Sequence, residues 1–231
     1  MCEILAVRWP TPTPFKAIMP WAEKIEYYGL ANFGWGVAWL EDSRVRRYRY
    51  EGRFSEDRSA AHELEDVSST HYLVHFRRPN RLSTVQLADT QPFLADGGRF
   101  AFCHNGSFTR EPEFRYRFAA RLKGQADSEV GFRMFEEILD QGVSVEEALV
   151  NTHHQLNGSA NLGYLGADGE LVVFNAYPSN RIFRFRTDEA EVAATELHSP
   201  DDSLFRLVFP AATERRAISA AESLAQPKLT R

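Results

Sequence analysis

Two consecutive amphipathic helices stand between two runs of strand-like segments, and this order restricts the fold more than any other feature of the sequence. Apolar residues recur with a helical period over 127–140. Ser144 and Glu147 then form a capping box that opens a second helix, which Asn157-Gly158 ends. A doubly wound parallel sheet would need strands that alternate with helices. The observed order instead predicts an α+β fold with a largely antiparallel sheet.

The expected strands are short apolar or alternating segments on both sides of the helix pair. They cover 2–8, 35–40, 45–50, 71–76, 99–103, 160–165, 171–175, 181–186 and 204–209. The Pro-rich segment 10–14 is expected to stop the first strand, and Asp168-Gly169 is a hairpin signal. The stretch 77–98 is expected to be a long functional loop. The tail after Ala211 is polar and is expected to be helical at best and frayed.

Composition excludes several classes of function. The 231 residues carry a net charge of −5, which disfavours nucleic-acid binding through phosphates. Arg44, Arg46, Arg47 and Arg49 form a basic strip, which we interpret as a solvated strand face. The sequence has no GxGxxG motif and no P-loop, and no apolar run approaches the ~20 residues that span a bilayer. Early prolines interrupt any signal-peptide core, so we expect a cytoplasmic protein that binds no membrane.

The sequence offers no metal or cofactor signature. Its only cysteines are Cys2 and Cys103, too few for a disulfide framework or a CxxC clamp. His153 and His154 are adjacent on the second predicted helix, where side chains diverge by about 100° and chelate one ion poorly. We therefore expect no metal and no cofactor. The simplest interpretation of Cys103 is a small buried apolar residue.

Cys2 is the first candidate for chemistry. If the initiator methionine is trimmed, one residue carries both a thiol and an α-amine. The α-amine has a reference pKa of about 7.7–8.0 and could accept the thiol proton near neutral pH. The alternative is that Cys2 merely begins a strand and that Met1 stays.

Three further motifs carry polar groups at the ends of predicted elements. In His104-Asn105-Gly106, a side-chain amide and a glycine N–H could form an oxyanion hole, although an ordinary Asn-Gly turn is the simpler interpretation. Arg77 follows a strand and suits a carboxylate, but it could also be a surface arginine. Asp127 begins a helix and could pair with an ammonium group or act as an N-cap.

The ordered set of motifs resembles the class-II glutamine amidotransferase domain, a branch of the N-terminal nucleophile hydrolases. The resemblance covers roughly residues 1–175 and is strongest to compact stand-alone members, including the γ-glutamyl amidohydrolase type. The series reads Met1-Cys2, Gly34-Trp35-Gly36, His75-Phe76-Arg77, Gln91-Pro92-Phe93, His104-Asn105-Gly106 and Asp127-Ser128-Glu129.

The resemblance implies a role for each matching residue. Cys2 would be the nucleophile and its α-amine the general base. Asn105 and the Gly106 N–H would form the oxyanion hole. Arg77 would hold the α-carboxylate of glutamine, and Asp127 its α-ammonium. The fold implied is a four-layer αββα sandwich, here a single domain over 1–231.

The resemblance also places Gly34-Trp35-Gly36 beside the nucleophile, and we include this segment with Asn80 among the substrate-binding residues. Asn80 stands where the family often has Thr, Cys103 replaces a smaller residue, and Phe33 precedes the glycine where the family often has Asp. These departures affect the substrate loop more than the nucleophile.

The predicted function is hydrolysis of the side-chain amide of glutamine or of a γ-glutamyl compound. The substrate would be a small molecule, and any transfer of the ammonia would need a synthase partner subunit. The alternative is a catalytically silent relative that keeps Met1 and serves as a binding or assembly subunit.

Overall fold

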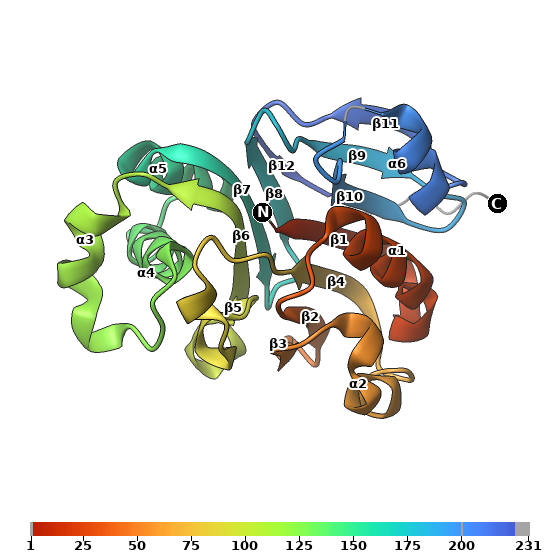
Figure 1. Cartoon of the computed structure of the whole chain (residues 1–231), viewed down its shortest axis with the longest axis horizontal. Coiled ribbons are helices and arrows are strands. Elements are labelled where there is room, and N and C mark those ends of the chain that lie inside the picture. The colour runs from red at the N-terminus through yellow and green to blue at the C-terminus, as the bar shows by residue number, and fades with distance from the viewer. Residues whose placement is uncertain (1, 200, 225–231) are drawn as a thin grey trace.

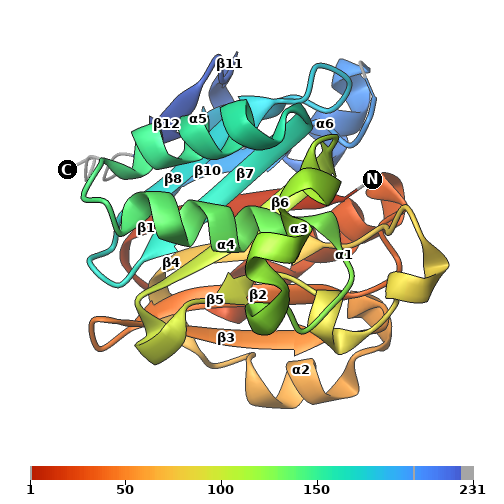
Figure 2. The ribbon, with the colours of Figure 1, turned by 90° about the vertical axis from the view of Figure 1, so that its left-hand side faces the viewer.

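Two antiparallel sheets lie face to face, and helices cover the outer face of each (Figure 1). The computed structural model describes residues 2–199 and 201–224. The same arrangement seen from the side shows two helices lying across one sheet (Figure 2). The expected α+β fold with the layer order αββα is therefore confirmed.

The larger sheet has seven strands in the order β11-β9-β10-β1-β4-β2-β3. β1 is central, pairing with β10 on one side and with β4 on the other. The strands in spatial order are β11 (Thr213–Ala217), β9 (Ile182–Arg186), β10 (Glu191–Thr195), β1 (Glu3–Pro14), β4 (Ser68–Phe76), β2 (Trp35–Glu41) and β3 (Arg44–Tyr50).

The smaller sheet has five strands in the order β12-β8-β7-β6-β5. β6 pairs with β7 along its whole length, from Phe100 to Phe108. The strands in spatial order are β12 (Ala221–Ser223), β8 (Leu171–Ala176), β7 (Gly158–Gly166), β6 (Phe100–Phe108) and β5 (Phe93–Leu94).

The helices divide between the two outer faces. α4 (Asp127–Leu139) and α5 (Val145–Leu156) cover the five-stranded sheet, and α3 (Glu111–Phe118) lies beside α4 (Figure 1). The seven-stranded sheet is covered by α1 (Met19–Gly29), α2 (Arg58–Glu63) and α6 (Asp202–Val208).

Alternating side chains of β1 build two of the three core clusters. Ile4 and Ala6 face the other sheet, while Leu5 and Val7 face the helices. All four are fully buried. Because both faces of β1 are covered, its sequence is a continuous apolar run rather than an alternating one. This central position fixes the place of Cys2, which directly precedes the strand.

Several elements differ from the sequence-based expectation. Segment 204–209 was expected to be a strand, but 204–208 lie in α6 and Phe209 is its C-cap. The helix forms because Phe205 and Val208 lie one helical turn apart in the core and Asp201 caps its N-terminus. The tail after Ala211 forms β11 and β12 instead of a frayed helix, while its last seven residues lie outside the described part. β1 continues through the prolines to Pro14, since prolines at alternate positions remove N–H groups from only one edge.

Candidate active site

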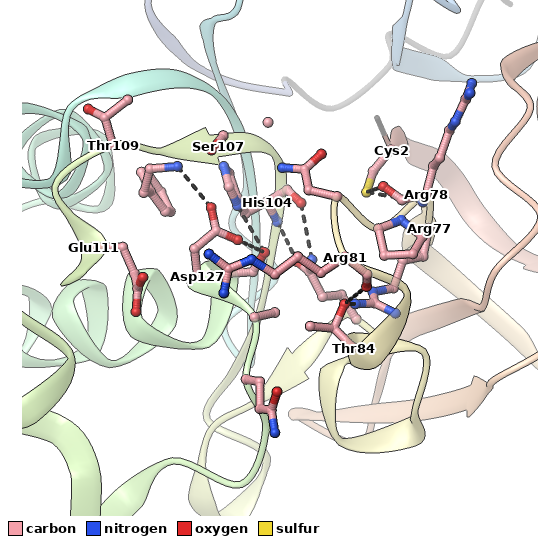
Figure 3. A pocket seen from close by; sticks show the side chains of 18 of the residues that line it. Cys2, Arg77, Arg78, Arg81, Thr84, His104, Ser107, Thr109, Glu111 and Asp127 are labelled. Carbon is pink, nitrogen blue, oxygen red and sulfur yellow. Dashed lines mark hydrogen bonds between the residues drawn. The ribbon is translucent and has the colours of Figure 1, made fainter.

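A cleft of about 300 Å³ opens at the N-terminal end of β1. Figure 3 shows Cys2 and Arg77 on one side of it and Asp127 and Glu111 on the other. The remaining wall comes from the segment after β4, the end of β6 and the start of α4. Its other lining residues are Arg78, Pro79, Asn80, Arg81, Thr84, Gln91, His104, Gly106, Ser107, Phe108, Thr109, Pro112, Gln125, Ala126 and Ser128.

The backbone of Cys2 is fixed by Asn105. The Cys2 N–H donates to Asn105 Oδ1 at 3.0 Å, which joins the start of β1 to β6 of the other sheet. Asn105 is completely buried, and its Nδ2 has no hydrogen-bond partner among the described residues. An unpaired buried donor costs about 1–3 kcal/mol. Asn105 thus contacts the Cys2 backbone from behind, because it is not among the residues that line the cleft.

The Cys2 thiol lies at the floor of the cleft. It is 9% exposed, and the Arg78 N–H points at Sγ from 3.4 Å. Burial raises the pKa of the Cys2 thiol above its usual value. The neutral thiol is therefore favoured, and a nucleophilic thiolate would need a base close by.

Gly106 brings the backbone of β6 close to β7. Its φ is +138°, and a Cβ at this position would lie 1.9 Å from the Ser159 carbonyl oxygen. Only glycine fits this conformation and this approach. The motif His104-Asn105-Gly106 is therefore part of a strand and not an Asn-Gly turn.

Arg77 follows directly after β4 and turns into the cleft. Its Nη2 donates to Thr84 Oγ1 at 2.7 Å, and its N–H donates to the Gly34 carbonyl at 2.8 Å. The side chain is 3% exposed, and Nη1 has no partner within the described part of the chain. One arm of the guanidinium is thus anchored and the other remains available for a carboxylate.

Asp127 is the first residue of α4, and Ala126 occupies the N-cap position without a side-chain cap bond. The Phe108 N–H donates to Asp127 Oδ2 at 2.8 Å, and Ser128 Oγ lies 3.4 Å from Oδ1. The N-cap interpretation of Asp127 is therefore wrong. Its carboxylate faces the cleft at the positive end of a helix.

His104 organises the floor behind Asp127. The side chain of Gln91 makes two hydrogen bonds to the His104 backbone: Oε1 accepts the N–H at 2.6 Å, and Nε2 donates to the carbonyl at 3.1 Å. Nδ1 of the ring lies 3.0 Å from Ser128 Oγ, and the ring stacks on Phe108 at 4.0 Å. Burial lowers the pKa of His104 to about 4, so the ring is neutral at pH 7.

Of the remaining residues that the sequence predicts for the site, only one lines the cleft. Asn80 lines the cleft, whereas Gly34, Trp35 and Gly36 do not. Trp35 lies in the core and donates from Nε1 to Asp57 at 3.1 Å. The Gly34 carbonyl accepts the Arg77 N–H, which links this segment to the cleft.

Sequence reasoning missed Thr84 as the anchor of Arg77 and Asn180 as a partner of Cys2. Thr84 lies seven residues after Arg77 and Asn180 lies in a loop, so neither carries a motif of its own.

The arginine strip of β3 is only partly a solvated face. Arg46 pairs with Glu41, but Arg47 and Arg49 are half-buried and donate to the carbonyls of Pro92 and Thr90. They hold the segment that carries Gln91.

Within residues 2–199 and 201–224, no group of three or more His, Cys, Asp or Glu side chains is placed to hold a metal ion. In this same part of the chain, no helix is long and apolar enough to cross a membrane.

Two antiparallel sheets lie between layers of helices. Cys2 directly precedes a central strand, and the amide of Asn105 from the facing sheet binds its N–H. This is the fold of the N-terminal nucleophile hydrolases. The sequence profile described as "Glutamine amidotransferases class-II" matches residues 1–226. The chain belongs to this family.

Curated relatives match over part of their length. The chain is 27% identical over 161 residues to glutamine–fructose-6-phosphate aminotransferase (isomerizing) of Staphylococcus aureus strain Mu50, covering 67% of this chain and 25% of that protein. The same enzyme from Bacillus licheniformis is 26% identical over 184 residues, covering 75% and 28%. The chain therefore spans about a quarter of the length of these relatives.

Solved structures share the fold. Glutamine phosphoribosylpyrophosphate amidotransferase from B. subtilis has a TM-score of 0.73 at 15% identity, covering 98% of this chain and 50% of that one. A glutamine aminotransferase class-II domain protein from Silicibacter pomeroyi has a TM-score of 0.61 at 18% identity, covering 84% and 89%.

Proposed function

We propose that this protein hydrolyses the side-chain amide of glutamine or of a γ-glutamyl compound, with Cys2 as an N-terminal nucleophile. The main support for this proposal is the environment of the Asn105 side-chain amide. Its oxygen accepts the Cys2 N–H at 3.0 Å, and its buried Nδ2 has no partner among the described residues. One side chain can thus orient the nucleophile and offer a donor to the oxyanion.

The reaction would run in two halves. With Met1 removed, the α-amine takes the thiol proton, and the Cys2 sulfur attacks the γ-carbonyl carbon. The oxyanion is held by Asn105 Nδ2 and the Gly106 N–H. The α-ammonium donates its proton to the amide nitrogen as the C–N bond breaks, and this nitrogen leaves as ammonia or amine. Water then attacks the γ-glutamyl thioester, releasing glutamate and restoring the thiol.

The opposite charges in the cleft would select the amino-acid end of the substrate. Arg77 offers Nη1 to the α-carboxylate, and Asp127 faces the α-ammonium. Asn80 lines the same cleft and would also contact the substrate.

We also propose that residues 1–231 act as one domain, since one core cluster contains residues of both sheets, among them Ile4 and Leu73 of the larger and Cys103 and Val173 of the smaller. Transfer of the released ammonia to a second substrate would require a synthase partner. Without one, the protein would act as a simple amidohydrolase.

The test combines intact-mass analysis with a substrate panel of glutamine, asparagine, γ-glutamyl amides and γ-glutamyl peptides. Loss of one methionine residue together with release of ammonia or amine from γ-glutamyl substrates is the expected result. Full retention of Met1 with no hydrolysis would favour the catalytically silent relative.

A further inference from the structure

The backbone at the start of β1 is held by side chains on the side of β10. The ladder between β1 and β10 reaches only to the pair Leu5 and Ala194. Beyond it, Thr195 Oγ1 accepts the Ile4 N–H at 3.2 Å, and Asn180 Nδ2 donates to the Cys2 carbonyl at 3.3 Å. Side chains therefore replace the missing ladder bonds up to residue 2.

Asn180 is itself fixed on every polar atom. It is fully buried in the connection between β8 and β9. Its carbonyl accepts from Asn161 Nδ2 at 2.5 Å, and its Oδ1 accepts the His198 N–H at 2.9 Å. Its Nδ2 also lies 3.1 Å from Glu3 Oε2 and 2.9 Å from His198 Nε2. These bonds prevent the amide from rotating away from Cys2.

We propose that Asn180 is a positioning residue for the Cys2 thiol, a role that rests on the proposed function. Asn105 holds the N–H of Cys2 from the five-stranded sheet, and Asn180 holds its carbonyl from the opposite side. A residue at a processed chain end would otherwise fray. With both backbone groups fixed, the Cα–Cβ bond has one direction, and the thiol can move only by rotation about that bond.

Asn161 supports Asn180 by donating to its backbone carbonyl. It is the cross-strand partner of Asn105 in the β6–β7 register, and it is fully buried. Directly opposed residues present their side chains on the same face of the sheet. Asn105 and Asn161, on adjacent strands, thus support both hydrogen bonds to the Cys2 backbone. Asn105 accepts the Cys2 N–H directly, and Asn161 binds Asn180, which donates to the Cys2 carbonyl.

The decisive variants are Asn180→Ala and a matched control, Asn175→Ala. Asn175 lies in β8, shortly before that connection, and its side chain also binds backbone groups other than those of Cys2. Its Nδ2 donates to the Ile218 carbonyl at 2.6 Å, and its Oδ1 accepts the Ile182 N–H at 3.3 Å. A nucleophile displaced by about 1 Å can lose ~10²-fold in rate. We expect Asn180→Ala to lower kcat about 10- to 100-fold with KM within about twofold. Asn175→Ala should keep kcat within about twofold.

Equal losses of kcat in Asn180→Ala and Asn175→Ala would overturn the proposal, because both residues would then act only through the fold. A folded Asn180→Ala protein with unchanged kcat would overturn it as well. If Asn180→Ala does not fold, Asn180→Asp decides by the same criteria, since it keeps the size and the acceptor for His198. Failure of both to fold would assign Asn180 to folding alone. A wild-type protein that hydrolyses no amide would instead overturn the proposed function itself.

Discussion

Asn105 joins the two sheets at Cys2: its Oδ1 accepts the Cys2 N–H at 3.0 Å, while its Nδ2 is buried without a partner in the described part of the chain. The bond places the first residue before β1 against β6. In the proposed reaction, the unpaired Nδ2 would be one of the two donors that hold the oxyanion.

Asn105→Ala should lower kcat about 10²–10³-fold and change KM little, because the oxyanion exists only along the reaction path. Asn105→Asp is the matched variant, since it keeps the acceptor for Cys2 and removes the donor, and it should be similarly impaired. Steady-state kinetics on glutamine and a γ-glutamyl amide make the comparison. An effect confined to KM would move Asn105 from the oxyanion hole to substrate binding.

Arg77→Lys should weaken binding of substrates that carry an α-carboxylate. The guanidinium is anchored by Thr84 and offers a second arm, a fork that lysine cannot reproduce. The loss should be about 1.5–3 kcal/mol for the charged hydrogen bond, seen as a higher KM. Thr84→Val, which frees the guanidinium without removing it, should have a smaller effect. Equal losses on an amide that lacks the α-carboxylate would show that Arg77 has another role.

Asp127→Asn should weaken recognition of the α-ammonium with little change in stability. Asn keeps an acceptor for the Phe108 N–H, and Asp127 caps no helix. Only the favourable charge in the first turn is lost, about 0.3–1 kcal/mol. The ratio of kcat/KM for glutamine to that for an amide without an α-amino group should fall. An unchanged ratio would place the ammonium site elsewhere.

Glu3→Gln should flatten the decline of stability between pH 4.5 and about pH 8. Burial raises the pKa of Glu3 to about 8 from its usual 4.5. Its stabilising contribution is present below pH 4.5. It is lost as pH rises toward 8, because the unfolded state releases the proton first. The loss is at most about 1.4 kcal/mol per pH unit. Urea unfolding at pH 5, 6.5 and 8 should show a shallower decline in Glu3→Gln, and parallel curves would contradict the assignment.

The sequence predicts the fold well where local signals and tertiary packing agree. The helix pair α4 and α5 appears with its expected bounds, because the apolar period and the Ser144 cap act locally. Segment 204–209 was predicted wrongly since its run is too short to distinguish a strand from a helix by period. The helical conformation is favoured by tertiary packing, because it places Phe205 and Val208 together on the outer face of the seven-stranded sheet.

The site was predictable only where its residues belong to contiguous motifs. Cys2, Arg77 and Asp127 line one cleft, although they are far apart in the sequence. Asn180 and Thr84 could not be found this way. Each acts through a contact that the topology alone creates, between the β8–β9 connection and Cys2 or between a loop and Arg77.

The most direct measurement is the turnover of Cys2→Ala on glutamine and γ-glutamyl amides, beside the wild-type protein. Alanine is also small enough for Met1 to be trimmed, so the two proteins differ only in the thiol, and intact mass verifies this. We expect no hydrolysis above background in Cys2→Ala, with the thermal midpoint close to that of the wild type. Turnover equal to that of the wild type would contradict the assignment of Cys2 as the nucleophile.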